Sequence, residues 1–208
     1  MYNKFLERLL DDDPQKTISK SGIRIRKIIS PILRRIVPFV TPNSKLIILR
    51  RAKMPNKPVI FAATHGFRED AEHTVVMAGR QAYVLNGSVS QVFKSFDGIT
   101  NWIAGMILVD RADKKSRVAA KNKMIYALKS GASIIIFPEG TWNKSPNELI
   151  SGLFPGIYDI AKESGALVAP IATFRCGKKH MGYWRKLLIL LNMNKKKVLE
   201  FCVTKWLQ

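Results

Sequence analysis

The stretch that decides the fold is Ile134-Ile135-Ile136-Phe137-Pro138-Glu139-Gly140-Thr141. Three consecutive isoleucines predict a strand that is buried on both faces, which is typical of a parallel sheet covered by helices. The turn that follows stands at the carboxyl end of this strand, where open α/β sheets bind their ligands. We therefore expect the carboxylate of Glu139 at the mouth of a site.

A second apolar run, residues 59–63, ends in Thr64-His65-Gly66-Phe67-Arg68-Glu69-Asp70. His65 and Asp70 are five residues apart, and on one α-helix this spacing would turn their side chains about 140° away from each other. We therefore expect His65 in a turn and Asp70 in the first turn of the following helix, where a carboxylate is favoured. The chain can then fold the imidazole back onto the carboxylate, as in a general base oriented by an acid.

Apolar runs alternate with helix-like segments through most of the chain. Strands are expected at residues 45–49, 59–63, 82–85, 106–109, 133–137, 167–172 and 198–203, and helices at 69–79, 91–103, 115–129 and 157–164. Helices that connect successive strands act as crossovers and favour parallel pairing. The expected fold class is α/β, with a largely parallel central sheet flanked by helices.

The chain carries 35 Lys and Arg against 15 Asp and Glu, a net charge of +20. Residues 14–68 contain thirteen Lys and Arg and no acidic residue. Within this stretch, aliphatic side chains recur at near-helical spacing between basic ones: Ile23, Ile25, Ile28, Ile29, Ile32, Leu33, Ile36 and Val37. Such basic amphipathic helices lie in the membrane interface. The alternative is that the apolar stripe packs on the sheet, with the basic residues as a solvated face.

The expected organisation is a basic, membrane-associating helical segment at residues 1–44, followed by an α/β domain at residues 45–208. Pro31 and Pro38 predict two short helices or a kinked one within the first segment. Residues 175–197 form a second basic and apolar cluster suited to a membrane interface. No secretory signal and no spanning stretch of ~20 apolar residues is found, so we expect a peripheral or monotopic protein at the cytoplasmic face of the membrane. Two cysteines imply no metal site.

The sequence resembles the glycerolipid acyltransferase family, which includes the bacterial 1-acyl-sn-glycerol-3-phosphate (lysophosphatidic acid) acyltransferases. Four segments match the family's motifs in order: His65 to Asp70 (H-x-x-x-x-D), Gly105 to Arg111, Phe137 to Thr141, and Val168 to Ile171. Together they span about half of the chain. The resemblance implies that a fatty acyl group moves from an acyl-carrier-protein or CoA thioester to the sn-2 hydroxyl of lysophosphatidate. Phosphatidic acid would be the product, for phospholipid biosynthesis, and no cofactor is needed beyond the thioester.

The resemblance also implies roles for the motif residues. His65 would deprotonate the attacking hydroxyl, with Asp70 holding the other ring nitrogen and no acyl-enzyme intermediate. Arg111 would bind the phosphate of the acceptor, and Glu139 would contact the glycerol hydroxyls. Two further residues are expected to donate hydrogen bonds to the acceptor or to the developing oxyanion, namely Gly140 and Thr141.

Each role has a structural alternative. His65 can be a core histidine that donates to a backbone carbonyl, Arg111 can form a local ion pair with Asp110, and Glu139 can be a turn acid. A further histidine, His73, is expected on the surface of the helix that begins near Asp70.

Some positions depart from the family's pattern. Thr64 and Phe67 stand where the family often has Asn and Ser, and Trp142-Asn143 stands where it often has Arg-Ser. The acceptor can therefore be another lyso-lipid, a glycolipid or glycerol 3-phosphate. A third possibility is a non-enzymatic basic module that binds anionic membrane or nucleic acid. Nucleic acid is disfavoured, because residues 24–35 interleave arginine with aliphatic rather than stacking aromatic side chains.

Overall fold

The computed structural model describes residues 9, 11–41, 45–50, 53–66, 69–87, 102–144, 152–176 and 179–184. The strands are β1 (Lys45–Arg50), β2 (Val59–Ala63), β3 (Ala82–Asn86), β4 (Met106–Leu108), β5 (Ser133–Ile136), β6 (Leu167–Cys176) and β7 (Lys179–Trp184). The helices are α2 (Pro14–Thr17), α3 (Lys20–Val40), α4 (Asp70–Ala78), α6 (Lys114–Lys129) and α7 (Gly156–Ser164). Most of the predicted elements are confirmed to within one or two residues.

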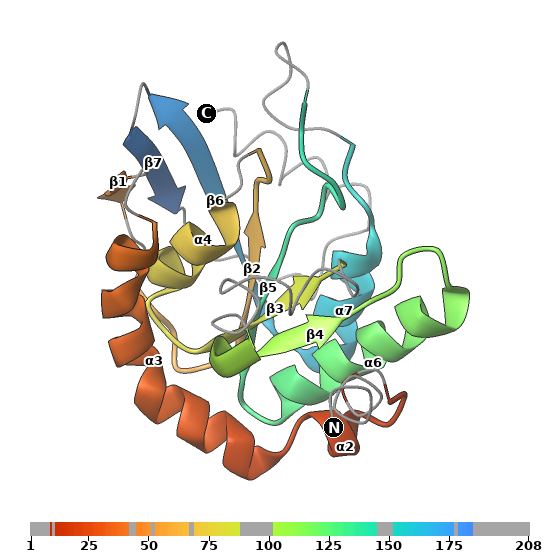
Figure 1. Ribbon diagram of the computed structural model, residues 1–208. Coiled ribbons are helices and arrows are strands. Elements are labelled where there is room, and N and C mark those ends of the chain that lie inside the picture. Colours follow the sequence, from red (N-terminus) through yellow and green to blue (C-terminus); the bar gives the residue numbers. More distant parts are fainter. Residues whose placement is uncertain are drawn as a thin grey trace.

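The strands form one seven-stranded sheet in the order β1-β7-β6-β2-β5-β3-β4 (Figure 1). The five strands from β6 to β4 pair in parallel. The hairpin partner β7 runs antiparallel to β6, and β1 pairs in parallel with β7. The expected α/β class with a largely parallel sheet is therefore confirmed.

Strand β2 lies at the centre of the sheet, and all five of its residues are fully buried. Its side chains alternate between two cores. Ile60 and Ala62 belong to the cluster that contains the buried side chains of α6 and α7, whereas Phe61 belongs to the cluster that contains Met77 and Ala78 of α4. Helices thus cover both faces, which explains why β2 and β5 are continuous apolar runs rather than alternating ones.

Helix α3 continues through Pro31 and Pro38 as a single helix, with Ser19 as its N-cap. The prediction of two short helices is wrong, and the kinked alternative holds, since Figure 1 shows the helix changing direction part-way. Its apolar residues divide between two sides. Ile23 is buried against the core, whereas five others stay exposed and lie along one side: Ile25, Ile28, Ile32, Ile36 and Phe39. We call these five residues the α3 stripe.

Some expectations fall outside the described residues. These are most of the predicted helix at residues 91–103, the predicted strand at 198–203 and most of the basic cluster at 175–197. The first part of that cluster instead forms β7, which the sequence did not predict. The division of the chain at residues 44 and 45 stays a prediction. Among the described helices, none is both long and apolar enough to cross a membrane.

Candidate active site

The register of three adjacent parallel strands places the predicted site residues level with one another. Ala62 of β2 pairs with Ile136 of β5, and Ala63 pairs with Ile171 of β6. Counting onward from these pairs sets His65 opposite Glu139 on one side and Thr173 on the other. The carboxyl ends of β2 and β5, together with β6 at that level, therefore form one site.

Asp70 begins α4 and is completely buried. Its Oδ2 lies 3.5 Å from His65 Nδ1 and accepts a hydrogen bond of 2.7 Å from the amide of Gly66. Its Oδ1 accepts a hydrogen bond of 3.1 Å from the hydroxyl of Thr173. A buried carboxylate needs such donors to offset its lost hydration. The 3.5 Å contact is longer than a standard hydrogen bond, and contacts of this kind commonly shorten when substrate binds.

The hydroxyls of Thr64 and Thr173 join β2 to β6 directly beside Asp70. Thr64 Oγ1 accepts from the Thr173 amide at 2.8 Å, and the two hydroxyl oxygens are 3.0 Å apart. Both residues are buried. The hydroxyl of Thr173 that donates to Asp70 is therefore held by the sheet itself, which fixes the carboxylate opposite His65.

Glu139 holds the backbone of the histidine turn. Its carboxylate is 2% exposed, and its Oε1 accepts a hydrogen bond of 2.8 Å from the amide of His65. The amide of Asn143 donates to the carbonyl of His65 at 2.7 Å, so the Glu139 loop contacts both polar groups of the His65 backbone. Glu139 therefore makes the kind of contact with a turn that the structural alternative expects. The predicted contact of Glu139 with glycerol hydroxyls stays a prediction.

Aromatic side chains surround the imidazole of His65. The ring of Phe137 stacks on it with a centroid distance of 4.3 Å, and the ring of Trp142 meets it edge-on at 5.9 Å. Phe154 packs over Gly140, where a Cβ atom would lie 2.6 Å from its ring. Trp142 is 48% exposed and Phe154 65%, so the rim of the site is apolar as well as aromatic. Such a rim suits an apolar substrate.

Gly140 and Thr141, the two predicted hydrogen-bond donors, differ in their present contacts and exposure. The amide of Gly140 is engaged within the turn, where it donates to the carbonyl of Phe137 at 3.0 Å. Gly140 also has φ 70°, a conformation that favours glycine, so its contribution here is the shape of the turn. Thr141 is exposed at the same rim.

Arg111 is not adjacent to His65. It follows β4, which lies three strand positions from β2, or about 14 Å at the usual spacing of ~4.8 Å per strand. Its exposed side chain lies over Gly87, at the end of β3, because a Cβ atom on Gly87 would be 2.7 Å from Arg111 Cζ. Since β3 lies between β4 and β5, the guanidinium is directed toward the site. Among the described ion pairs, none joins Arg111 to Asp110.

Sequence reasoning missed two features. Thr173 stands two residues beyond the matched segment at 168–171, on the strand next to β2, and this position at the end of a strand is the signal that could have found it. His73 is not on the surface, as predicted, but 1% exposed within α4. The part of the chain that the structure describes contains no group of three His, Cys, Asp or Glu residues suited to a metal.

Comparison with known proteins agrees with this geometry. The family model described as Acyltransferase matches residues 45–173, more than half of the chain. The chain belongs to the acyltransferase family. Membership of this family disfavours the non-enzymatic interpretation. The matched range contains all the predicted site residues.

The chain is also similar to individual proteins and to a solved structure that are named as acyltransferases. A 1-acyl-sn-glycerol-3-phosphate acyltransferase of Chlamydomonas reinhardtii is 25% identical over 65% of this chain and 40% of its own length. A chloroplastic enzyme of that name from Arabidopsis thaliana is 32% identical over 36% of this chain and 20% of its own. The chain thus spans well under half of these relatives. The crystal structure of the lysophosphatidic acid acyltransferase PlsC of Thermotoga maritima covers 98% of this chain and 88% of its own, with a TM-score of 0.62 and 17% identity. This likeness shows a shared fold.

The hydrogen bond from Thr173 to Asp70 gives a first prediction. We expect Asp70→Asn to lower kcat by about 10³-fold or more, because the imidazole loses its orienting charge. Thr173→Val should lower kcat by about tenfold, since a hydrogen bond to a charged group contributes about 1.5 kcal/mol or more. Steady-state acyl-transfer kinetics measure both. Thr173→Ser is the matched control and should keep most of the activity; an equal loss in Ser and Val would show that the hydroxyl does not matter.

Proposed function

We propose that this acyltransferase moves a fatty acyl group from an acyl-carrier-protein or CoA thioester to the sn-2 hydroxyl of 1-acyl-sn-glycerol 3-phosphate, forming phosphatidic acid. The observation that carries the proposal is the pairing of His65 with the buried, anchored carboxylate of Asp70 at the aromatic rim. Because Nδ1 faces Asp70, the other ring nitrogen, Nε2, remains for the hydroxyl of the acceptor. The names of the two relatives support this choice of acceptor.

The proposed reaction needs one base and no covalent enzyme intermediate. His65 Nε2 takes the proton of the acceptor hydroxyl while its oxygen attacks the thioester carbonyl carbon. Asp70 stabilises the imidazolium that forms. The tetrahedral intermediate then collapses, the C–S bond breaks, and the imidazolium returns its proton to the departing thiolate. The products are the new ester and a free thiol, and the imidazole is again neutral.

Arg111 is the proposed contact for the phosphate of the acceptor. A guanidinium presents planar pairs of donors that match phosphate oxygens. Its position over Gly87 places it between its own strand and the His65–Glu139 edge. An acceptor that extends from Nε2 of His65 toward β3 would bring its phosphate within reach of this side chain. Glu139 and Thr141 would then lie beside the glycerol portion.

A second candidate keeps the chemistry and changes the acceptor. Trp142 occupies the rim beside His65, at a position where the resembled family often has arginine. An exposed indole there favours an acceptor with a larger apolar or sugar surface and removes a cation near the phosphate. A neutral lyso-lipid or a glycolipid is therefore the alternative acceptor.

We also propose that the α3 stripe seats the enzyme on the cytoplasmic face of the membrane. Ile28 is 74% exposed and Phe39 82%, and both lie on the same side of one helix. Arg24 and Arg35 are exposed beside the stripe, where basic side chains meet anionic headgroups. A stripe flanked by cations is the pattern of a helix that lies in the interface rather than across it.

Acyl transfer to a panel of acceptors tests the proposed reaction. Purified protein in detergent is given labelled acyl-carrier-protein or acyl-CoA thioesters, with lysophosphatidate, glycerol 3-phosphate and neutral lyso-lipids side by side. We expect phosphatidic acid as the main product, and a loss of about 10³-fold in His65→Ala, because the base is removed. Unchanged thermal stability of that variant is the control. Retained turnover would contradict the role of His65, and product from neutral acceptors alone would favour the second candidate.

Gly87→Ala tests Arg111 without changing Arg111 itself. The added methyl group would overlap the guanidinium, so the side chain must leave its place over β3. We expect the KM for lysophosphatidate to rise about tenfold, with kcat and the KM for neutral acceptors little changed. Arg111→Gln should raise the KM for lysophosphatidate further, again with little change in the KM for neutral acceptors. Gly156→Ala, where an added Cβ meets nothing within 4 Å, is the matched control. An equal rise in KM for neutral acceptors would rule out a phosphate contact.

Vesicle co-sedimentation tests the α3 stripe. The double change Ile28→Ser and Phe39→Ser removes two exposed side chains that each contribute up to about 1.5–3 kcal/mol when buried. We therefore expect partition onto anionic vesicles to fall at least tenfold. Val118→Ser, at an apolar residue of α6 that is 53% exposed, is the matched control and should bind as the unchanged protein does. Equal binding by all three proteins would exclude the stripe as the membrane contact.

A further inference from the structure

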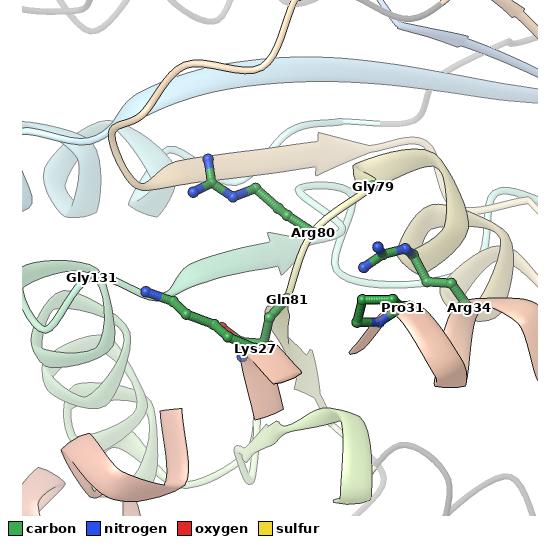
Figure 2. Close-up of a pocket in the computed structure, with 7 residues that line it drawn as sticks. All are labelled: Lys27, Pro31, Arg34, Gly79, Arg80, Gln81 and Gly131. Carbon is green, nitrogen blue, oxygen red and sulfur yellow. The ribbon is translucent and has the colours of Figure 1, made fainter. Parts of the chain in front are cut away.

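A polar cavity lies at the other end of the sheet from His65. It has a volume of about 330 Å³ and lies between α3, the turn before β3 and the turn before β5 (Figure 2). We call it the basal cavity; its lining residues are Lys27, Pro31, Arg34, Gly79, Arg80, Gln81 and Gly131. These turns precede the amino ends of β3 and β5, whereas His65 follows the carboxyl end of β2. Since β5 has four residues, the two places are about 13 Å or more apart.

Among the residues that the structure describes, the lining of the basal cavity contains three cationic side chains and no carboxylate. Arg80 is held in place because its guanidinium donates to the carbonyls of Pro55 and Lys57, both at 3.0 Å. Lys27 extends to the turn at Gly131, where its Nζ would lie 3.6 Å from an added Cβ atom. Figure 2 shows Lys27 and Arg34 of α3 around the same space as Arg80, which precedes β3.

Gln81 supplies the second observation. Its side chain lines the cavity and is 5% exposed, yet neither its amide nitrogen nor its amide oxygen has a hydrogen-bond partner among the described residues. A buried amide without partners is unfavourable. An oxygen-rich anion in the cavity would accept a hydrogen bond from the Nε2 amide of Gln81 and so remove part of this cost.

Helix ends beside the cavity favour cations as well. The cavity adjoins the carboxyl ends of α4 and α6, and cations are favoured at such ends. Each helix end is equivalent to about −0.5 charge, so the two together offset about one of the three positive charges. A cavity with a cationic lining suits a phosphate monoester, which carries roughly −1.5 to −2 charge at pH 7.

We propose that the basal cavity is a second anion site, distinct from the catalytic edge, that binds a phosphate group between α3 and the amino ends of β3 and β5. Bound phosphate links Lys27 and Arg34 of α3 to Arg80 and Gln81 of the sheet, so it stabilises the position of α3. The source is a soluble phosphate compound or a lipid headgroup. At 100° per residue, Lys27 and Arg34 face about 150° away from the α3 stripe, which favours the soluble source.

Thermal unfolding in inorganic phosphate, at constant ionic strength set with chloride, tests the site. All variants in this measurement also carry Arg111→Gln, so that phosphate bound at the proposed acceptor site does not contribute. The result therefore tests the basal cavity separately from the proposed function. We expect a saturable rise in melting temperature. Lys27→Gln with Arg34→Gln should weaken the apparent phosphate affinity at least tenfold. The matched control, Arg24→Gln with Arg35→Gln, removes the same charge from the same helix outside the cavity and should change the affinity less than twofold.

A variant of Gln81 distinguishes phosphate binding from a purely structural role of this side chain. Gln81→Met removes the amide at nearly constant volume, so we expect higher stability without phosphate and weaker phosphate binding, two effects of opposite sign. No saturable effect of phosphate, or equal losses in the cavity variant and its control, would overturn the proposal.

Vesicles of phosphatidylcholine with or without phosphatidic acid distinguish the two sources. Equal vesicle binding by the cavity variant and by the Arg111→Gln protein without further changes identifies a soluble phosphate. A selective loss in the cavity variant identifies a headgroup, and either outcome supports the phosphate site once the thermal shift is saturable.

Discussion

The parallel pairing of β2 with β5 on one side and β6 on the other is the constraint on which the candidate site depends. The pairs Ala62–Ile136 and Ala63–Ile171 set the level at which the three strands end. A slip of one residue would turn every side chain of β2 to the opposite face. Phe61 and Ala62 differ in size and pack into different cores, so such a slip would be costly. Packing in the core therefore fixes the position of the histidine turn.

Two buried carboxylates fix the histidine turn at the level that the strand register sets. Asp70 and Glu139 are almost fully buried, and each accepts a hydrogen bond from a backbone amide of the turn that carries His65. These contacts offset the cost of removing carboxylates from water. They also hold the backbone of the histidine turn before substrate arrives, which is the preorganisation that acyl transfer benefits from. The same residues thus serve folding and the proposed chemistry.

Helix α3 contacts the core, the basal cavity and the solvent. Ile23 and Ser30 are buried toward the fold, the α3 stripe is exposed, and Lys27 and Arg34 line the basal cavity. Because 3.6 residues complete a turn, a helix of 21 residues can present the stripe on one side, with the core contacts and the two basic side chains next to each other on the opposite side. The amphipathic pattern alone contains all three sets of residues, but it does not say which apolar residues face inward.

The sequence by itself determined the α/β class, the bounds of most strands, and the candidates His65, Asp70 and Glu139, because buried strands and strand-end turns are encoded in adjacent residues. Only the tertiary structure decided the rest. It placed Thr173 against Asp70, the carboxylate of Glu139 against the amide of His65, and the guanidinium of Arg111 over Gly87. It also buried His73 and formed the strand β7, which the sequence did not predict. These features join residues that are distant along the chain, and they depend on strand order, register and the direction of side chains, which no local pattern contains.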